Sequence, residues 1–213
     1  MKIQTLPVGP IETNCHLAID EATRRAVLLD PGDDAHALLS HLRAKNLALD
    51  AILVTHGHPD HILALADLSD ALPEVPVWFP AGDLPWAFTA ANALAGFLPA
   101  PRRPAAELHS ATEGTVLALA GAEWHCLETP GHTPGGVCWH VPAADVLFTG
   151  DTLFAGSAGR TDLPGGDYPT LLRSLRRLAG LPGSPAILPG HGPASTLDAE
   201  RRANPFLQLH AGG

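Results

Sequence analysis

The 213-residue chain has few cysteines and few basic residues, and it has no long apolar run. Its three cysteines, Cys15, Cys126 and Cys138, are odd in number and form no close pair along the sequence. This excludes a disulfide framework and a cysteine-rich zinc module. We therefore expect the cysteines to be small core residues.

Basic residues are scarce: 13 Lys and Arg stand against 22 Asp and Glu, which gives a formal net charge of −9. Proteins that bind nucleic acids use clustered Lys and Arg to neutralise phosphate charge. The one dense basic group, Arg173, Arg176 and Arg177, would share a solvated face of a helix. The composition therefore disfavours a nucleic-acid partner.

No apolar run approaches the roughly 18 to 20 residues needed to span a bilayer. The N-terminus, Met1 to Thr5, has one lysine and no apolar core of an export signal. We therefore expect a cytoplasmic protein with no membrane partner. The length and the absence of a linker predict one domain over residues 1–213, and no pattern specifies an oligomeric state.

Short apolar segments bounded by Gly and Pro predict strands, and apolar residues at helical spacing predict helices. The predicted strands cover residues 3–8, 15–19, 26–30, 51–54, 75–79, 116–118, 124–128, 137–141, 146–149 and 186–188. The predicted helices cover residues 37–46, 62–72, 168–178 and 197–204. A further helix is expected at 86–98, whose aromatic residues suit either a pocket wall or plain packing. Each half of the chain has strands followed by helices, which predicts two sheets face to face with helices outside.

Three histidines and a carboxylate, His56, His58, Asp60 and His61, follow directly after the buried strand at 51–54. In an extended segment residues i and i+2 project to the same side, so His56 and His58 can converge while Asp60 and His61 begin the next helix. Divalent metals take nitrogen and oxygen donors at about 2 Å. This cluster therefore predicts a metal site.

Three later turns each hold one further candidate ligand. His132, Asp151 and His191 lie in Gly-rich or Pro-rich turns just after predicted strands, at residues 129–135, 149–152 and 188–193. Any one of them alone suits a turn residue that hydrogen-bonds its own backbone. Together with the first cluster, they predict that all these side chains meet on one rim.

With this order of residues, the chain resembles the metallo-β-lactamase fold superfamily nearly end to end. The resemblance implies an α/β (α+β) protein with an αββα sandwich. It also implies one or two Zn²⁺ ions, with Fe or Mn as alternatives, one held by His56, His58 and His132, a second by Asp60, His61 and His191, and Asp151 bridging the pair.

Two segments, Phe148 to Phe154 and Gly159 to Asp162, are similar to the compact bacterial members of the hydroxyacylglutathione hydrolase (glyoxalase II) group. This resemblance implies hydrolysis of a small-molecule thioester such as S-D-lactoylglutathione. The metal would lower the pKa of a bound water to give hydroxide near neutral pH, and Asp60 or Asp151 would orient it.

The same resemblance assigns roles to two more residues. Arg160 falls where the family has a basic residue that contacts glutathione, with a surface ion pair as the alternative. Asp30 is expected to support a metal ligand from behind the site, with a helix-capping turn as the alternative. Longer glyoxalase II enzymes add a C-terminal helical domain with further glutathione contacts, and we expect none here.

Other activities within the superfamily remain alternatives. A mononuclear-iron persulfide dioxygenase acting on glutathione persulfide also carries a Gly-Arg-Thr-Asp segment, but the stretch from Phe154 to Ser157 favours the hydrolase. A β-lactamase is less expected because the region around Arg160 and the Pro-Gly-His-Gly-Pro segment differ from that group. A nucleic-acid-processing enzyme conflicts with the acidic charge, and a flavodiiron-type domain normally has a carboxylate where this chain has His58.

Overall fold

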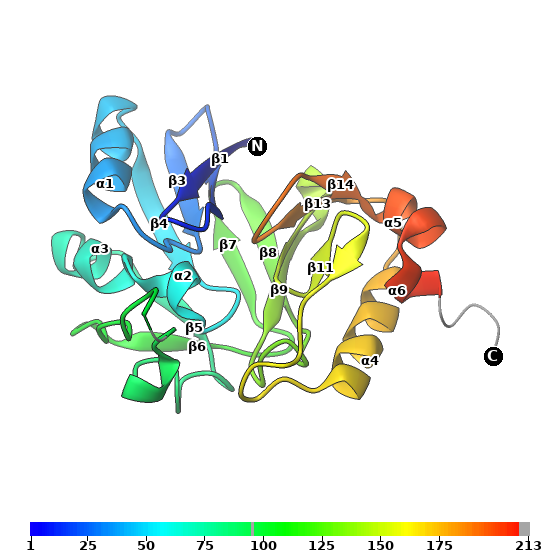
Figure 1. Ribbon diagram of the computed structural model, residues 1–213. Helices are drawn as coiled ribbons and strands as arrows, with labels where there is room; N and C mark the ends of the chain where they lie inside the picture. Colours follow the sequence, from blue (N-terminus) through cyan, green and yellow to red (C-terminus); the bar gives the residue numbers. More distant parts are fainter. Residues whose placement is uncertain (95, 209–213) are drawn as a thin grey trace.

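The computed structural model describes residues 1–94 and 96–208, and it has the αββα architecture that the sequence predicts (Figure 1). Two six-stranded sheets lie face to face, with helices on both outer faces. A short two-stranded sheet pairs β11 (Leu153–Phe154) with β12 (Ser157–Ala158).

The first sheet comes from the N-terminal half. Its strands, in their order across the sheet, are β1 (Lys2–Val8), β2 (Thr13–Ile19), β3 (Arg25–Leu29), β4 (Ala48–Leu53), β5 (Val77–Pro80) and β6 (Leu108–Ala111). The first three strands form the antiparallel meander that the sequence predicts, and β3 to β6 run parallel.

The second sheet comes from the C-terminal half. Its strands, in their order across the sheet, are β14 (Ser195–Thr196), β13 (Ala186–Pro189), β10 (Val146–Gly150), β9 (Val137–Val141), β8 (Ala122–Glu128) and β7 (Val116–Leu119). Because β9 is antiparallel to both β8 and β10, and β13 is parallel to β10, the strands β8, β10 and β13 all end at the same edge.

The helices cover the outer faces of the two sheets. On the first sheet lie α1 (Ala35–Ala44), α2 (Pro59–Ile62) and α3 (Leu65–Ala71), and on the second α4 (Tyr168–Ala179), α5 (Leu197–Ala203) and α6 (Pro205–Gln208). The short 3₁₀ helices are η1 (Ala90–Asn92) and η2 (Pro142–Ala144). In the described residues, no helix has both the length and the apolar character needed to cross a membrane.

Neighbouring residues of the buried strands face opposite sides of the sheet, and this produces three apolar layers. On β3, Leu28 packs toward the outer helices, whereas its neighbour Leu29 packs into the layer between the sheets. On β10, Leu147 likewise faces α4 while Phe148 faces the other sheet. Strands buried on both faces read as continuous apolar runs, which is why these segments show little alternation in the sequence. All three cysteines are free and buried, as predicted.

Two helix predictions need correction. The helix predicted at 62–72 is interrupted at Leu63 and Ala64, so that α2 and α3 are separate. The helix predicted at 86–98 is wrong: apart from Ala95, which lies outside the described residues, the segment contains only turns, an isolated bridge and η1. Polar side chains there bond local carbonyls, as Thr89 does to Trp86 and Asn92 does to Ala87, and such bonds compete with a helix.

Candidate metal centre

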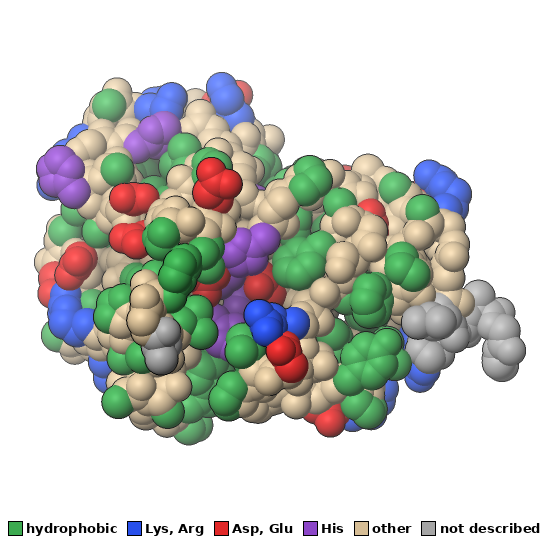
Figure 2. All heavy atoms as spheres, in the orientation of Figure 1, with side chains coloured by type: hydrophobic (Ala, Val, Ile, Leu, Met, Phe, Trp, Pro, Cys, Tyr) green, Lys and Arg blue, Asp and Glu red, His purple; other side chains and the backbone are tan. Residues whose placement is uncertain are grey.

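The seven candidate ligands follow the carboxyl ends of strands in both sheets. His56, His58, Asp60 and His61 come after β4, His132 after β8, Asp151 after β10 and His191 after β13. Side chains beyond the carboxyl ends of parallel strands share one edge of a sheet, and the two sheets bring these edges together. Histidine side chains accordingly gather in the hollow between the halves (Figure 2).

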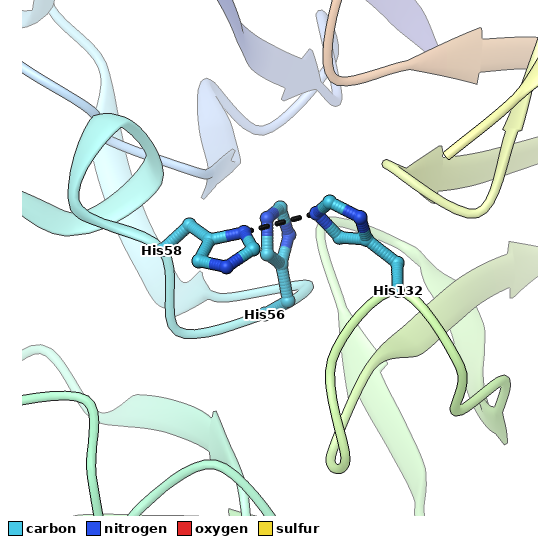
Figure 3. Close-up of side chains that lie close together, drawn as sticks. All are labelled: His56, His58 and His132. Carbon is cyan, nitrogen blue, oxygen red and sulfur yellow. Dashed lines mark hydrogen bonds between the residues drawn. The ribbon is translucent and has the colours of Figure 1, made fainter. Parts of the chain in front are cut away.

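His56, His58 and His132 form the first group. Figure 3 shows their rings turned toward one another, with His58 Nδ1 and His132 Nε2 2.9 Å apart. One nitrogen from each ring lies within 4.8 Å of the others. The first two come from the loop after β4 and the third from the turn after β8, so this group joins the two sheets.

Asp60, His61 and His191 form the second group, with ligand atoms again within 4.8 Å of one another. The His191 Nε2 atom lies 3.0 Å from Asp60 Oδ2, and the His61 Nε2 atom lies 3.3 Å from the same oxygen. The Thr13 hydroxyl donates a hydrogen bond to that oxygen at 3.1 Å, which fixes the carboxylate.

Asp151 lies between the two groups. Its Oδ1 atom is 3.4 Å from His61 Nε2, and its Oδ2 atom is 3.6 Å from His132 Nε2 and 3.7 Å from His191 Nε2. The structure thus places one carboxylate beside both sets of ligands, at the position where the sequence resemblance implies a bridge.

The hydrogen bonds of two histidines on the outer side of the site determine which ring nitrogen faces the centre with a lone pair. His132 Nδ1 lies 2.7 Å from the Arg160 backbone carbonyl, which can only accept, so Nδ1 carries the proton and Nε2 faces the centre with its lone pair. The Thr55 hydroxyl donates to Asp30 and can therefore accept from His56 Nδ1 at 3.1 Å. The Nε2 atom of His56 then also faces inward with a free lone pair.

Asp30 holds the site from behind. Its carboxylate accepts hydrogen bonds from the Thr55 backbone N–H at 2.7 Å, the Thr55 hydroxyl at 2.6 Å and His61 Nδ1 at 3.0 Å. Its oxygens are thereby occupied, although they lie near His56 and His61. The N-cap of α1 is Asp34, so Asp30 does not form the capping turn that the sequence left as an alternative.

Burial and neighbouring charges favour neutral rings in the first group. Burial, together with the neighbouring His61 and His132, lowers the pKa of His56 well below its ordinary value. Burial and then His132 lower the pKa of His58 to about 4. Both rings are therefore neutral near pH 7, which is the form that ligates metals.

The second group has the opposite electrostatics. Burial alone would lower the pKa of His61, but the carboxylates of Asp60 and Asp151 outweigh it and hold that pKa well above its ordinary value. Burial likewise opposes the ionised form of Asp60, yet His61 and His191 hold its pKa below the usual range. This group therefore stabilises positive charge next to its carboxylates.

The residues fit divalent cations. Three buried ligand atoms, His56 Nε2, His61 Nε2 and Asp151 Oδ1, have no hydrogen-bond partner among the described residues. Buried polar atoms are rarely left unpaired, and a cation that receives their lone pairs would satisfy all three. Imidazole and carboxylate donors without a thiolate suit zinc, iron and manganese.

Glycines allow the second sheet to approach the ligands. A Cβ atom on Gly190 would stand 2.3 Å from Asp151 Oδ1 and 2.6 Å from His61 Cε1. Gly150 has φ +48°, and a Cβ there would meet the Thr55 hydroxyl at 2.4 Å. Only residues without a side chain fit at these positions. The sequence suggests this close approach by its Gly-rich turns.

The side chain of Arg160 lies at the surface and is paired with Asp162. This side chain is 62% exposed, and its guanidinium forms a bidentate pair with Asp162 at 2.6 Å, while the Arg160 backbone carbonyl holds His132. The structure thus forms the surface ion pair that the sequence left as an alternative. A contact with glutathione stays a prediction.

Asp83 is a buried residue that sequence reasoning missed. Its carboxylate accepts hydrogen bonds from the Gly57 N–H at 2.8 Å, the Thr133 hydroxyl at 2.7 Å and the Gly135 N–H at 2.6 Å. It therefore ties the loop that holds His56 and His58 to the turn that holds His132. Asp83 follows β5, as Asp30 follows β3, and this position after a parallel strand was the available signal.

Comparison with known proteins gives a consistent result. The sequence profile of the metallo-beta-lactamase superfamily matches residues 8–191. The hydroxyacylglutathione hydrolase GloC of Haemophilus influenzae is 36% identical over 210 residues, which cover 97% of this chain and 98% of that protein.

Two solved structures are similar along their whole length. BLEG-1 B3 metallo-beta-lactamase has a TM-score of 0.89 and 37% identity, with 97% of this chain and 100% of that chain covered. TTHA1623, solved in a di-iron-bound form, has a TM-score of 0.83 and 40% identity, with 96% and 100% covered.

Proposed function

This chain belongs to the metallo-beta-lactamase superfamily, and from that premise we propose that it hydrolyses thioesters, with glutathione thioesters such as S-D-lactoylglutathione as the substrate class. The family and the ligand cluster together make the protein a metal-dependent hydrolase. The observation that carries the proposal is the position of Asp151 between two groups of ligands. The curated relative named as a hydroxyacylglutathione hydrolase supports the choice of thioester.

The chemistry requires water, an electrophilic carbonyl and a leaving group. Divalent cations at this centre, zinc or iron in our proposal, would lower the pKa of a bound water and polarise the carbonyl under attack. The oxygen of water adds to the acyl carbon, the carbon–sulfur bond breaks, and the thiolate leaves and takes up a proton. The products are a carboxylate and a thiol, and the second proton of the water passes to the solvent.

The chain's own residues hold the reacting water in place. Asp151 Oδ1 is buried without a hydrogen-bond partner among the described residues, so it can accept a hydrogen bond from that water. Asp60 is fixed by Thr13 and His191 and can orient the water from the other side. A thiolate is a good leaving group, so no side-chain acid is required.

The test is hydrolysis by protein whose metal content has been measured. We expect S-D-lactoylglutathione and simple acyl-glutathiones to be cleaved, with the rate proportional to bound metal and abolished by a chelator. Metal analysis on the same sample decides between zinc and iron and between one and two ions. Failure of fully loaded protein to cleave any thioester would overturn the proposal.

β-Lactams are the second candidate substrate class, because one similar structure is that of a B3 metallo-beta-lactamase. A chromogenic cephalosporin assayed beside the thioesters compares the two classes directly. Oxygen uptake with glutathione persulfide tests the dioxygenase alternative on the same protein. We expect kcat/KM to be highest for a thioester, and a higher value for either competitor would replace the proposal.

A further inference from the structure

A pocket of about 460 Å³ adjoins the first group of ligands. His58 lies on its wall, and the apolar wall comes from Trp86, Leu94, Pro134 and Leu163. The Trp86 ring meets the His58 ring edge to face, with centroids 5.6 Å apart. The pocket is therefore continuous with the centre where the carbonyl must lie.

Among the described residues, the lining of this pocket has no charged side chain. Its polar members include His58 and Asn92, and the Asn92 amide already donates hydrogen bonds to the carbonyls of Gly57 and Ala87. The side chain of Arg160, the candidate contact for glutathione, is exposed and paired with Asp162, and Arg160 is not among the lining residues. Because a charged group loses much free energy when it enters an apolar site, the carboxylates and ammonium of glutathione do not belong in this pocket.

The pocket is also larger than the expected acyl group requires. Sites of about 300 to 1,000 Å³ enclose drug-sized ligands, whereas a lactoyl group has three carbons and a hydroxyl. An unfilled apolar pocket forfeits dispersion contacts that a longer chain would make. Both charge and size therefore point to an apolar occupant several carbons long.

We propose that this pocket binds the acyl chain of the substrate, and that the preferred substrates are thioesters of apolar acyl groups longer than lactoyl. The charged thiol carrier then lies outside, toward Arg160. This inference rests on the proposed thioester hydrolysis and deepens it by naming the class of acyl group. Trp86 and Leu163 are the specificity-determining residues.

The pocket wall is attached to the ligand loop. The Gly57 peptide between His56 and His58 is held at both ends, since its N–H donates to Asp83 and its carbonyl accepts from Asn92. Both partners belong to the segment that carries Trp86. An acyl chain that packs on this wall is thus placed in a fixed position relative to His58, so its length should affect kcat/KM.

The test is a series of glutathione thioesters with acetyl, butanoyl, hexanoyl and lactoyl groups, assayed on the metal-loaded full chain. We expect kcat/KM to rise about fourfold per methylene from acetyl to hexanoyl, as a buried methylene does in transfer from water. Leu163→Asn should reduce the rise of kcat/KM with acyl chain length. The control Val116→Asn, at an exposed apolar position on β7, should keep it. Ala93→Phe, which fills the pocket from an exposed position, should lower the rate for hexanoyl more than for acetyl.

A binding measurement separates this inference from the proposed function. Hexanoate should quench tryptophan fluorescence of the loaded protein at a concentration at least tenfold below that of acetate, and Trp86→Phe should remove this signal. Hydrolysis with a flat chain-length series and equal binding of both acids overturns the acyl pocket and leaves thioester hydrolysis standing. If no thioester is cleaved, the function is overturned, and with it the acyl assignment, whatever the two acids show.

Discussion

The first sheet supplies four of the seven candidate ligands from one loop, whereas the second sheet supplies three from three separate turns. The loop after β4 is anchored by Asp30 and Asp83, which both come from the ends of neighbouring strands. The turns of the second sheet are anchored across the site by the first sheet. Asp83 accepts hydrogen bonds from Thr133 and Gly135 in the turn of His132. Asn14 on β2 donates to the carbonyls of Pro189 and Gly192 beside His191.

The exposed fraction of the side chain sets His191 apart from the other histidine ligands. The side chain of His61 is fully buried and that of His132 is 5% exposed, but that of His191 is 30% exposed. The ligands of both sheets are thus largely desolvated, and the site is most open at His191. We expect the cation beside His191 to exchange more readily than the one beside His56.

Asp151→Ala gives the largest expected effect, because this carboxylate lies between both groups. Its removal should lower activity by more than the roughly 100-fold that mutation of an outer partner causes. Bound metal, measured by elemental analysis, should fall for both groups. His191→Ala is the matched comparison and should remove only one equivalent. An Asp151→Ala protein that keeps two ions and its activity would contradict the bridging assignment.

Asp30→Asn tests the anchoring of the first sheet. The amide can accept through one oxygen only, so one of the three donors from Thr55 and His61 loses its partner. An unpaired buried donor costs about 1 to 3 kcal/mol. Metal affinity should fall by roughly 10- to 100-fold in a chelator competition. Asp70→Asn, at an exposed carboxylate paired with Arg102, is the control and should leave the affinity unchanged.

The sequence predicted most of the fold because the relevant signals are local. Apolar runs marked the buried strands, and helical spacing marked α1, α4 and α5 close to their observed ends. The two-residue strands β11, β12 and β14 were missed because they are too short to show a pattern. The four-residue strand β6 (Leu108–Ala111) was also missed, since its sequence shows no apolar run. The segment at 86–98 was predicted wrongly because its aromatic spacing imitates a helix, while its polar side chains bond nearby carbonyls instead.

For the site, the sequence identified the residues that the structure brings together but not all that hold them. The loop from His56 to His61 is contiguous, and the other three ligands share a type of turn. The sequence signal for Asp83 is limited to its position after a parallel strand, and its role depends on β5 lying beside β4 in the sheet. Contacts made by strand order are invisible to local patterns.

Asp83→Asn tests this missed anchor and should have a smaller effect than Asp30→Asn, since Asp83 touches no ligand side chain. One of its three donors, from Gly57, Thr133 or Gly135, would lose its partner. We expect kcat/KM to fall about tenfold, the lower end for outer partners, with metal content retained. Thr133→Val removes one of these bonds together with its donor, so no buried donor is left unpaired and the loss should be smaller. An equal or larger loss of kcat/KM in Thr133→Val would contradict the role of Asp83 in tying the two ligand loops together.

Arg160→Ala should give the smallest effect, because its side chain is exposed and only its backbone carbonyl holds His132. If the guanidinium contacts glutathione, KM for acyl-glutathiones should rise severalfold while kcat stays constant, since the interaction is the same in ground and transition states. Asp162→Asn releases Arg160 from its ion pair and should lower KM instead. An unchanged KM in both variants would make the Arg160–Asp162 pair a surface feature, for which exposed pairs contribute about 0 to 1 kcal/mol.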